Sequence, residues 1–272
     1  MEEIHSDWGD WLPRAVAAAD PDGVTAWYLG CNGVILKASD GTTVFIDPYL
    51  GTGDPPRTIR MTPVPFHPGD VEAASAVLAT HDHVDHTHGP SQAPILERTG
   101  APFYGPPASV EEATGWLDDW DLATDQLGTV TPGERVEAGS FTVHVEDAHD
   151  PDAVDPVSYV VEHDAGTFFH GGDSKPADAF ADVGERYDID VGVVALGSQG
   201  RVPPDGAVRK WYCDPDEAAE VARDLQLDRL VPTHWDMWKR VRADPTAVLD
   251  PVRGFDYPRS VRILEAGDSI EI

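Results

Sequence analysis

The segment 77–89, VLATHDHVDHTHG, gathers metal-binding side chains directly after an apolar run. Its ligand types follow an H-x-H-x-D-H pattern made by His81, His83, Asp85 and His86. In an extended loop, side chains two positions apart point the same way, so His81 and His83 can bind one cation. Asp85 and His86 lie at the following turn and can reach a second cation. The pattern therefore indicates a metal site rather than isolated polar side chains.

A metal ion needs more ligands than this segment provides, and three further candidates stand near the ends of apolar runs. They are His149 in VEDAHD, Asp173 in FFHGGDS and His234 in LVPTHWD. Added to the histidine segment, they supply two sites that are roughly tetrahedral to five-coordinate. The expected ligands are His81, His83 and His149 for the first ion and Asp85, His86 and His234 for the second, with Asp173 bridging the two.

Apolar runs and turn residues indicate the elements that must position these side chains. In the first half, residues 75–80 predict a strand that ends at the histidines, and residues 89–100 predict a helix closed by Gly100. Residues 57–70, rich in Pro and Gly, predict a long loop that could cover a site. The other elements expected there are a helix over 8–19 and strands over 25–30, 33–39 and 42–50.

The second half of the chain also combines predicted strands with a predicted helix. The elements expected there are strands over 135–148, 156–163, 166–174, 191–197 and 229–236 and an amphipathic helix over 214–227. Strand sets and helices in both halves suit an α/β layered sandwich, with two sheets inside and helices outside. No strict repeat and no linker interrupts the chain, so we expect a single domain over residues 1–272.

The charge balance limits the classes of partner. The chain has 272 residues, 49 of them acidic and 19 basic, for a formal net charge of −30. Such a surface repels nucleic acid, so no nucleic-acid partner is expected. The acidic residues are spread along the whole chain, which argues against an acidic tail. We interpret the composition as adaptation to high salt, where the Debye length falls to about 3 Å at 1 M.

Two further features concern location and redox chemistry. The sequence has no run of 18 apolar residues, and its first residues are acidic where a signal peptide needs basic ones. We therefore expect a cytoplasmic protein without membrane contact. Cys31 and Cys213 are expected to be free buried thiols, and neither is assigned chemistry.

The ordered motifs THDHVDH, VFIDPYL with Asp47, GGDS and PTHWD resemble those of the metallo-β-lactamase superfamily. Together with WYLGCNGVILKAS, VALGSQG and PTHWDMWKRVRADP they also resemble the L-ascorbate-6-phosphate lactonase family, in order over most of the chain. The superfamily resemblance implies a four-layer αββα sandwich with a two-metal site along one edge. The lactonase resemblance implies a small anionic substrate, with a phosphorylated sugar-acid lactone as the family's example, and also raises the option of a homo-oligomer.

The sequence departs from the lactonase family in places. His149 falls where those lactonases need not have a histidine, and the chain is shorter in the middle and at its C-terminus. In the wider superfamily a histidine at that position is the usual third ligand, and Asp147 is the alternative. Asp47 ends an apolar strand, where we expect it to orient the histidine loop by hydrogen bonds rather than to bind metal.

Two metal ions a few Å apart would share a water and lower its pKa from 15.7 towards about 7. The resulting hydroxide is the expected nucleophile on a lactone or other ester carbonyl, and Asp85 or Asp173 could pass a proton to the leaving alkoxide. The ligand types suit Zn or Mn, with Fe as a further option. No thiolate is among the expected ligands.

A phosphate on the substrate would need a cationic partner. The local candidates are Lys175, Arg201, Arg209 and Lys210, and the alternative is that these residues are surface counter-charges. Trp235 could line the pocket, as could Trp238, although aromatics at such positions are more often part of the core.

Three functional interpretations remain open from the sequence. The first is a metal-dependent hydrolase of a small anionic lactone or ester. The second is a metal-dependent phosphodiesterase on the same fold, since two-metal sites also suit attack at phosphorus. The third is a non-catalytic metal-binding protein, against which stands the filling of every expected ligand position.

Overall fold

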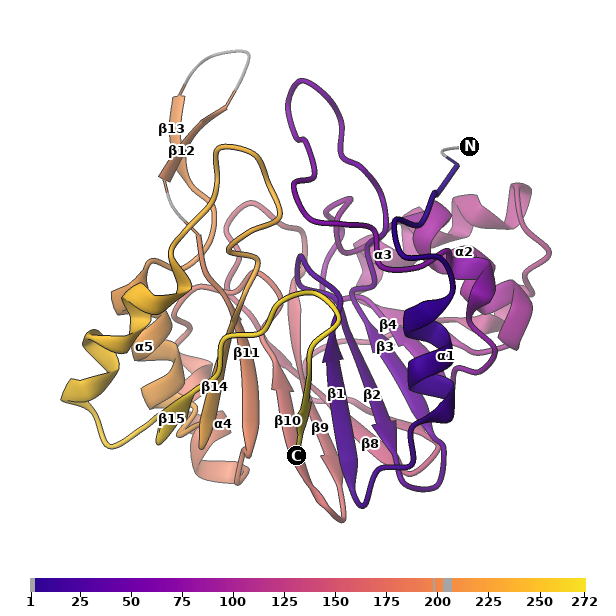
Figure 1. Ribbon diagram of the computed structural model, residues 1–272. Coiled ribbons are helices and arrows are strands. Elements are labelled where there is room, and N and C mark those ends of the chain that lie inside the picture. The colour runs from indigo at the N-terminus through magenta and orange to yellow at the C-terminus, as the bar shows by residue number, and fades with distance from the viewer. Residues whose placement is uncertain (1–2, 198, 203–206) are drawn as a thin grey trace.

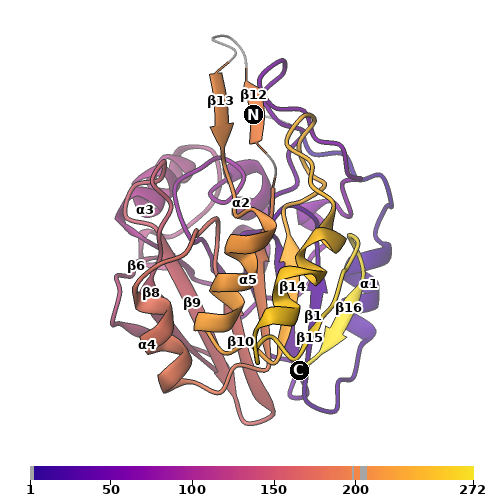
Figure 2. The ribbon, with the colours of Figure 1, turned by 90° about the vertical axis from the view of Figure 1, so that its left-hand side faces the viewer.

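Two seven-stranded sheets form the centre of the molecule in this computed structural model (Figure 1). The structure describes residues 3–272 apart from 198 and 203–206, and for residues 199–202 and 207–209 it describes the backbone alone. The first sheet has the order β16-β1-β2-β3-β4-β5-β6 and the second the order β15-β14-β11-β10-β9-β8-β7. A separate hairpin of β12 (Gln199–Val202) and β13 (Ala207–Lys210) stands beyond them (Figure 2).

The first sheet changes from antiparallel to parallel pairing at β3. Strands β1, β2 and β3 are antiparallel neighbours, whereas β3, β4, β5 and β6 run parallel. Parallel strands need crossovers, and these supply the helices of this half. The strands are β1 (Val24–Tyr28), β2 (Val34–Ala38), β3 (Thr43–Ile46), β4 (Ala76–Leu78), β5 (Phe103–Gly105), β6 (Leu127–Thr129) and β16 (Ser269–Glu271).

The second sheet makes the same change at β10. Strands β7 to β10 are antiparallel, and β10, β11, β14 and β15 run parallel. Its parallel strands are apolar and buried on both faces, as in VGVVA of β11. The strands are β7 (Arg135–Ala138), β8 (Phe141–Asp147), β9 (Val157–His163), β10 (Gly166–His170), β11 (Val191–Ala195), β14 (Arg229–Thr233) and β15 (Ser260–Val261).

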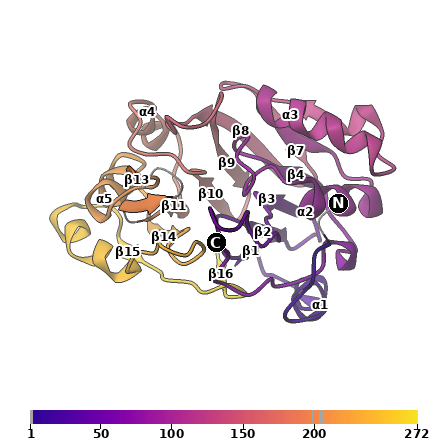
Figure 3. The same cartoon turned by 90° about the horizontal axis from the view of Figure 1, so that it is seen from above.

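Helices cover the outer face of each sheet, which gives four layers (Figure 3). One side carries α1 (Trp11–Ala18), α2 (Gly89–Thr99) and α3 (Pro107–Thr114), and the other carries α4 (Ala179–Arg186) and α5 (Pro215–Asp224). Short 3₁₀ turns lie at Pro68–Asp70, Gly115–Asp118, Thr124–Gln126, Pro245–Leu249 and Pro251–Gly254. The expected order of sheets and helices is therefore confirmed, and all described helices are far too short to span a membrane.

Three of the four apolar clusters among the described residues hold these layers together. The central core lies between the sheets and includes Leu36, Phe141 and Tyr159. The two outer cores lie under the helices, around Phe45 and Leu96 on one side and around Phe169, Phe180 and Val221 on the other. Because both faces of the inner strands are packed, the loops that leave the strand ends start from fixed positions.

Local sequence explains how the helix after the histidine segment begins and ends. Helix α2 starts with Gly89 and has Pro90 in its first turn, where the missing N–H costs nothing. It ends at Gly100, whose φ of 72° is the left-handed cap that glycine adopts without strain. The predicted helix over 89–100 is thus confirmed, and it anchors the carboxyl end of the histidine loop.

Candidate metal centre

The candidate ligands meet at one edge of the sandwich, where several strands end. Asp47 follows β3, His81 follows β4, Asp173 follows β10, and His234 follows Thr233 of β14. Strands that run parallel carry their carboxyl ends to the same edge, so residues far apart in sequence converge there. Three residues of this edge, Cys31, Asp47 and His234, have positive φ although they are not glycine. Such strained backbone is found where the surrounding structure holds a functional geometry.

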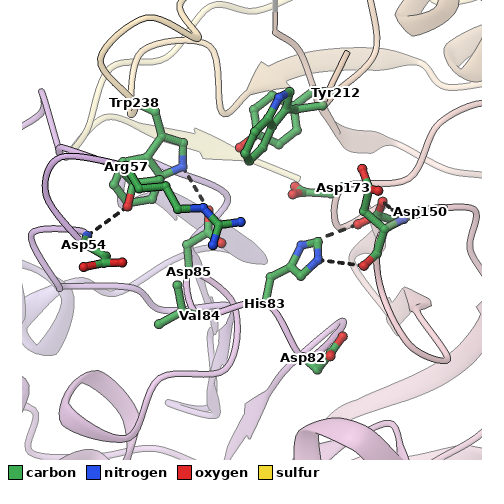
Figure 4. A pocket seen from close by; sticks show the side chains of 13 residues that line it. Asp54, Arg57, Asp82, His83, Val84, Asp85, Asp150, Asp173, Tyr212 and Trp238 are labelled. Atoms are coloured by element: carbon green, nitrogen blue, oxygen red, sulfur yellow. Dashed lines mark hydrogen bonds and ion pairs between the residues drawn. The ribbon is translucent and has the colours of Figure 1, made fainter. Parts of the chain in front are cut away.

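The first group of ligand atoms comes from three loops. His81 Nε2 lies 3.0 Å from His83 Nδ1. Asp150 Oδ2 lies 3.7 Å from His81 Nε2 and 3.6 Å from His83 Nδ1. Asp173 Oδ2 lies 3.9 Å from the same His81 atom. The four residues therefore converge on one point with a nitrogen or carboxylate oxygen each, and Figure 4 shows His83, Asp150 and Asp173 of this group.

The second group lies on the other side of Asp173. Asp173 Oδ2 is 3.3 Å from His86 Nε2, and its Oδ1 is 3.5 Å from His234 Nε2. Asp85 Oδ2 is 3.3 Å from the same His234 atom. The Sγ of Cys31 also belongs to this group, at 3.4 Å from His234 Nε2. Asp173 is thus the residue that the two groups share.

These spacings fit divalent ions. In a tetrahedral site with bonds of about 2.1 Å, neighbouring ligand atoms are roughly 3.4 Å apart, and the separations above scatter around that value. His86 Nε2 provides a second observation, because it is buried and has no hydrogen-bond partner within the described part of the chain. A buried polar atom without a partner is costly, and an ion among these ligands would satisfy it.

Asp47 fixes the orientation of two histidines without joining either group. Its Oδ2 accepts from His86 Nδ1 at 2.7 Å and from the Thr80 hydroxyl at 2.6 Å. The Thr80 oxygen lies 3.0 Å from His81 Nδ1 and, since its own proton is donated to Asp47, it accepts there. Both histidines therefore carry a proton on Nδ1 and direct Nε2 at the candidate site.

Two further contacts orient the remaining ligands. His83 Nε2 donates to the carbonyl oxygen of Asp152 at 3.1 Å, which leaves Nδ1 free for an ion. Asn32 donates from Nδ2 to Asp173 Oδ1 at 3.3 Å, and its own Oδ1 accepts from Thr233 at 2.6 Å. The shared carboxylate is therefore held by a residue from the turn between β1 and β2.

The electrostatics of the cluster lower the pKa values of Asp47, Asp85 and Asp173, whereas burial and the nearby Asp173 raise that of Asp150. Burial lowers the pKa of His81 to about 3, and the neighbouring His86 adds to this shift. Burial also opposes a charge on His86, but nearby carboxylates, Asp173 foremost, outweigh it and raise the pKa of His86 well above its usual value. The pKa of Asp85 lies well below its usual range, because His86 and His234 outweigh the effect of burial. Three buried carboxylates around a charged histidine are a site that divalent cations would stabilise.

His149 does not join the cluster, contrary to the ligand set expected from the sequence. Its side chain is exposed, with Nδ1 3.0 Å from the carbonyl oxygen of Pro176. The alternative Asp147 is also exposed, at the end of β8. The structure places Asp150 beside His81 and His83 instead, and Asp150 Oδ1 accepts from the backbone of Asp152 at 3.1 Å. The backbone turn after β8 brings the next residue inward.

A cavity of about 450 Å³ opens onto the cluster (Figure 4). Its lining includes the ligands His83, Asp85, Asp150 and Asp173. The other lining residues are Asp54, Arg57, Thr58, Asp82, Val84, Asp152, Trp211, Tyr212 and Trp238. The cavity therefore combines an aromatic wall with carboxylates and a single guanidinium among the described residues.

The substrate-binding residues expected from the sequence lie elsewhere or are engaged. Lys210 forms ion pairs with Asp214 at 2.7 Å and Glu217 at 2.6 Å, and Lys175 Nζ donates to the carbonyl oxygen of Lys210. Trp235 packs against the outer core below α5 rather than lining the cavity. The side chains of Arg201 and Arg209 lie outside the described part of the structure.

Several residues of the site escaped the sequence analysis. Asp150 is adjacent to the histidine that was chosen, and Arg57 starts the loop that was predicted to cover a site. Cys31 and Asn32 stand in a Gly-flanked turn that shows no metal-binding pattern. Trp211 and Tyr212 lie between the hairpin β12–β13 and α5, where no signal in the sequence connects them to the histidine segment.

Comparisons with known proteins agree with this architecture. Residues 42–235 match the family model described as "Beta-lactamase superfamily domain". A protein of Escherichia coli named as a probable L-ascorbate-6-phosphate lactonase is 28% identical over 290 residues, covering 89% of this chain and 78% of that protein. A similarly named protein of Escherichia fergusonii is 29% identical over 287 residues, with the same coverage.

Among solved structures, one similar fold is Igni18, described as a novel metallo hydrolase from the hyperthermophilic archaeon Ignicoccus hospitalis. It superimposes with a TM-score of 0.69 at 20% identity and covers 91% of this chain and 97% of its own. At that identity the likeness concerns the fold. The four-layer metallo-β-lactamase sandwich and the resemblance to the lactonases, both expected from the motifs, are confirmed.

Proposed function

The chain belongs to the beta-lactamase superfamily, and from that premise we propose that it is a metal-dependent hydrolase that opens a lactone or ester bond in a small anionic substrate. The observation that carries the proposal is Asp173, whose carboxylate is shared by two ligand groups at the edge of the cavity. A bridging carboxylate between two ligand sets is the arrangement that a two-metal hydrolytic site requires. The lactone is suggested by the curated lactonase relatives.

Each group has enough donors to hold one ion. The ligands that we propose are His81, His83 and Asp150 for the first ion and Asp85, His86 and His234 for the second, with Asp173 common to both. When bound, zinc or manganese ions would supply an activated water and an electrophile for the carbonyl. The protein residues supply the rest: they orient the substrate and transfer a proton to the leaving alkoxide.

Asp85 is well placed for proton transfer. Its Oδ2 accepts from the indole N–H of Trp238 at 3.0 Å, which fixes the rotation of the carboxylate at the cavity wall. Asp85 itself lines the cavity, so its Oδ1 can approach a bound substrate. We propose Asp85, with Asp173 as the alternative, as the carboxylate that takes up a proton from the attacking water and passes it to the leaving oxygen.

The cavity lining indicates where the anionic group of the substrate would bind. Arg57 is the guanidinium of the lining, and Figure 4 shows its side chain directed into the cavity. It forms no ion pair with any described residue. The cavity lining also includes the carboxylates Asp54, Asp82 and Asp152, which disfavour a polyanion. We therefore propose a substrate with one carboxylate or phosphate group, which Arg57 would bind while the scissile carbonyl faces the ligand cluster.

The function is tested by assaying metal-loaded protein in high salt on neutral lactones, on lactones that carry a carboxylate or phosphate, and on bis(p-nitrophenyl) phosphate. We expect metal-dependent opening of the anionic lactones to exceed turnover of the other substrates. Cleavage of the phosphodiester alone would instead establish a phosphodiesterase. Bound metal without turnover of any substrate would favour a non-catalytic metal-binding protein.

The Arg57→Ala variant should raise KM for an anionic lactone by roughly ten- to a hundredfold and leave kcat within a few fold, since a hydrogen bond to a charged group contributes about 1.5–3 kcal/mol. Turnover of a neutral lactone should not change. Arg14→Ala is the matched control, because Arg14 is exposed and pairs with Asp10 at 3.5 Å at the start of α1. An unchanged KM for every anionic substrate would remove Arg57 from the binding site.

A further inference from the structure

We propose that Cys31 is a thiolate ligand of the second ion, bound together with Asp85 and His234, and that this thiolate makes the second position prefer zinc over manganese. The inference rests on the proposed metal centre and adds to it a residue that sequence analysis left without chemistry. Binding would form a sulfur–metal bond while the thiol releases its proton to solvent, with no change of oxidation state.

The position of the sulfur carries the proposal. Cys31 Sγ lies 3.4 Å from His234 Nε2 and 3.6 Å from Asp85 Oδ2. In a tetrahedral zinc site, bonds of about 2.3 Å to sulfur and 2.0 Å to nitrogen place those two ligand atoms about 3.5 Å apart. The thiol is completely buried, so it faces this cluster and not solvent.

The backbone fixes the distance between Cys31 and His234. The Cys31 carbonyl oxygen accepts from the His234 N–H at 2.7 Å and from the Tyr28 hydroxyl at 2.8 Å. Since these hydrogen bonds hold the backbones of Cys31 and His234 together, they also fix the distance between the sulfur and the imidazole. The β1–β2 turn and the end of β14 therefore present their side chains as a pair.

An independent observation indicates that an ion belongs at this place. His86 Nε2, which is buried and without a hydrogen-bond partner among the described residues, lies 4.0 Å from Asp85 Oδ1 and 3.3 Å from Asp173 Oδ2. Its other nitrogen is engaged by Asp47 at 2.7 Å, so Nε2 can only be satisfied from within the cluster. An ion bound by Asp85 and His234 would satisfy it.

The alternative is a protonated thiol that donates a weak hydrogen bond to Asp85. The two interpretations differ in metal preference, since a soft thiolate favours zinc and cobalt, whereas manganese prefers carboxylate oxygen and water. They also differ in spectrum. A thiolate bound to Co²⁺ gives an intense charge-transfer absorption in the near ultraviolet, and a protonated thiol beside the ion gives none.

The test is the absorption spectrum of Co²⁺-loaded protein in three forms: the unchanged chain, Cys31→Ser and Cys213→Ser. Cys213 is the matched control, because it is the other cysteine of the sequence and its buried Sγ contacts the Ser174 carbonyl oxygen at 3.4 Å. We expect the charge-transfer band in the unchanged protein and in Cys213→Ser. Cys31→Ser should lose it while still binding Co²⁺, and its preference for Zn²⁺ over Mn²⁺ should fall at least about tenfold.

The outcomes separate this inference from the proposed function. Co²⁺ bound without a charge-transfer band in the unchanged protein would overturn the role of Cys31 and leave the hydrolase proposal intact. Absence of Co²⁺ binding would overturn both. If Cys31→Ser fails to fold, the band in Cys213→Ser still assigns the thiolate, because Cys31 is then the remaining cysteine of the chain.

Discussion

The Asp173→Ala variant is expected to lose at least about a thousandfold in kcat/KM and to retain at most one metal ion per chain. The reason is that its carboxylate lies within 3.3 Å of His86 Nε2 and 3.5 Å of His234 Nε2, and within 3.9 Å of His81 in the other group. Removing it takes a donor from both sites. The metal ions contribute several kcal/mol to lowering the barrier, and each 1.36 kcal/mol corresponds to a factor of ten.

Two matched variants make this result interpretable. Asp173→Asn keeps the shape of the side chain and its contact with Asn32 but removes the charge, so it should also lose most activity. Asp250→Asn removes an exposed carboxylate that pairs with Arg253 at 2.9 Å, and it should retain full activity. Elemental analysis measures the metal ions bound per chain, and steady-state kinetics on the same samples measures kcat/KM. Two bound ions and near-normal kcat/KM in Asp173→Ala would refute the bridging role.

Removal of metal with a chelator is expected to abolish hydrolysis and to lower the melting temperature by roughly 10 °C. Ligands that bind only the folded state stabilise it by about 4 kcal/mol when present at 1,000 times their Kd, and for a chain of this size each kcal/mol shifts the melting temperature by about 2–4 °C. The structural cause is local: Asp47, Asp85 and Asp173 are all buried within this one cluster. Without ions, their mutual repulsion is offset by the neighbouring histidines, His86 foremost.

Calorimetry of the same preparation before and after dialysis against the chelator measures this effect, with bound metal determined in each sample. Adding back zinc or manganese should restore both the melting temperature and the activity. The Asp173→Ala variant should show a much smaller shift, since it has less metal to lose. An unchanged melting temperature after complete removal of metal would contradict the assignment of the cluster.

The sequence determined the parts of the site that are encoded locally. His81, His83, Asp85 and His86 lie in one short segment, so their spacing alone was enough to predict that they act together. Asp173 and His234 each follow an apolar run. A polar side chain at the end of a buried strand suggests a functional role, because burying it without a partner is costly. The motif order also predicted the four-layer sandwich, which the family model and the observed sheets confirm.

The loop after β8 shows where local sequence was insufficient. His149 and Asp150 are both plausible ligands and neighbours in sequence, yet one points to solvent and the other into the cluster. The choice follows from backbone contacts across the fold: the His149 N–H donates to Ser174 at 2.8 Å, and the His149 carbonyl accepts from Lys175. A one-residue shift in such a loop exchanges the inward and outward side chains, and no propensity specifies it.

The cation that lines the cavity could not be predicted from the sequence either. Lys175 and Lys210 stand near ligand motifs in the sequence, but the fold uses Lys210 to pair with Asp214 and Glu217 beside α5. Arg57, from a loop more than a hundred residues away from Asp173, takes the position at the cavity instead. Which cation meets the substrate therefore depends on loop paths that meet only in three dimensions.

Residue type, spacing and apolar periodicity were thus enough to predict the fold and to mark the histidine segment as a candidate metal site. Three features became visible in the folded chain: Asp150 completes the first group, Asn32 and Asp47 contact the candidate ligands, and the sulfur of Cys31 lies near His234. Those contacts join residues from separate strand ends, at distances of a few Å that packing of the two sheets sets and that no local pattern records.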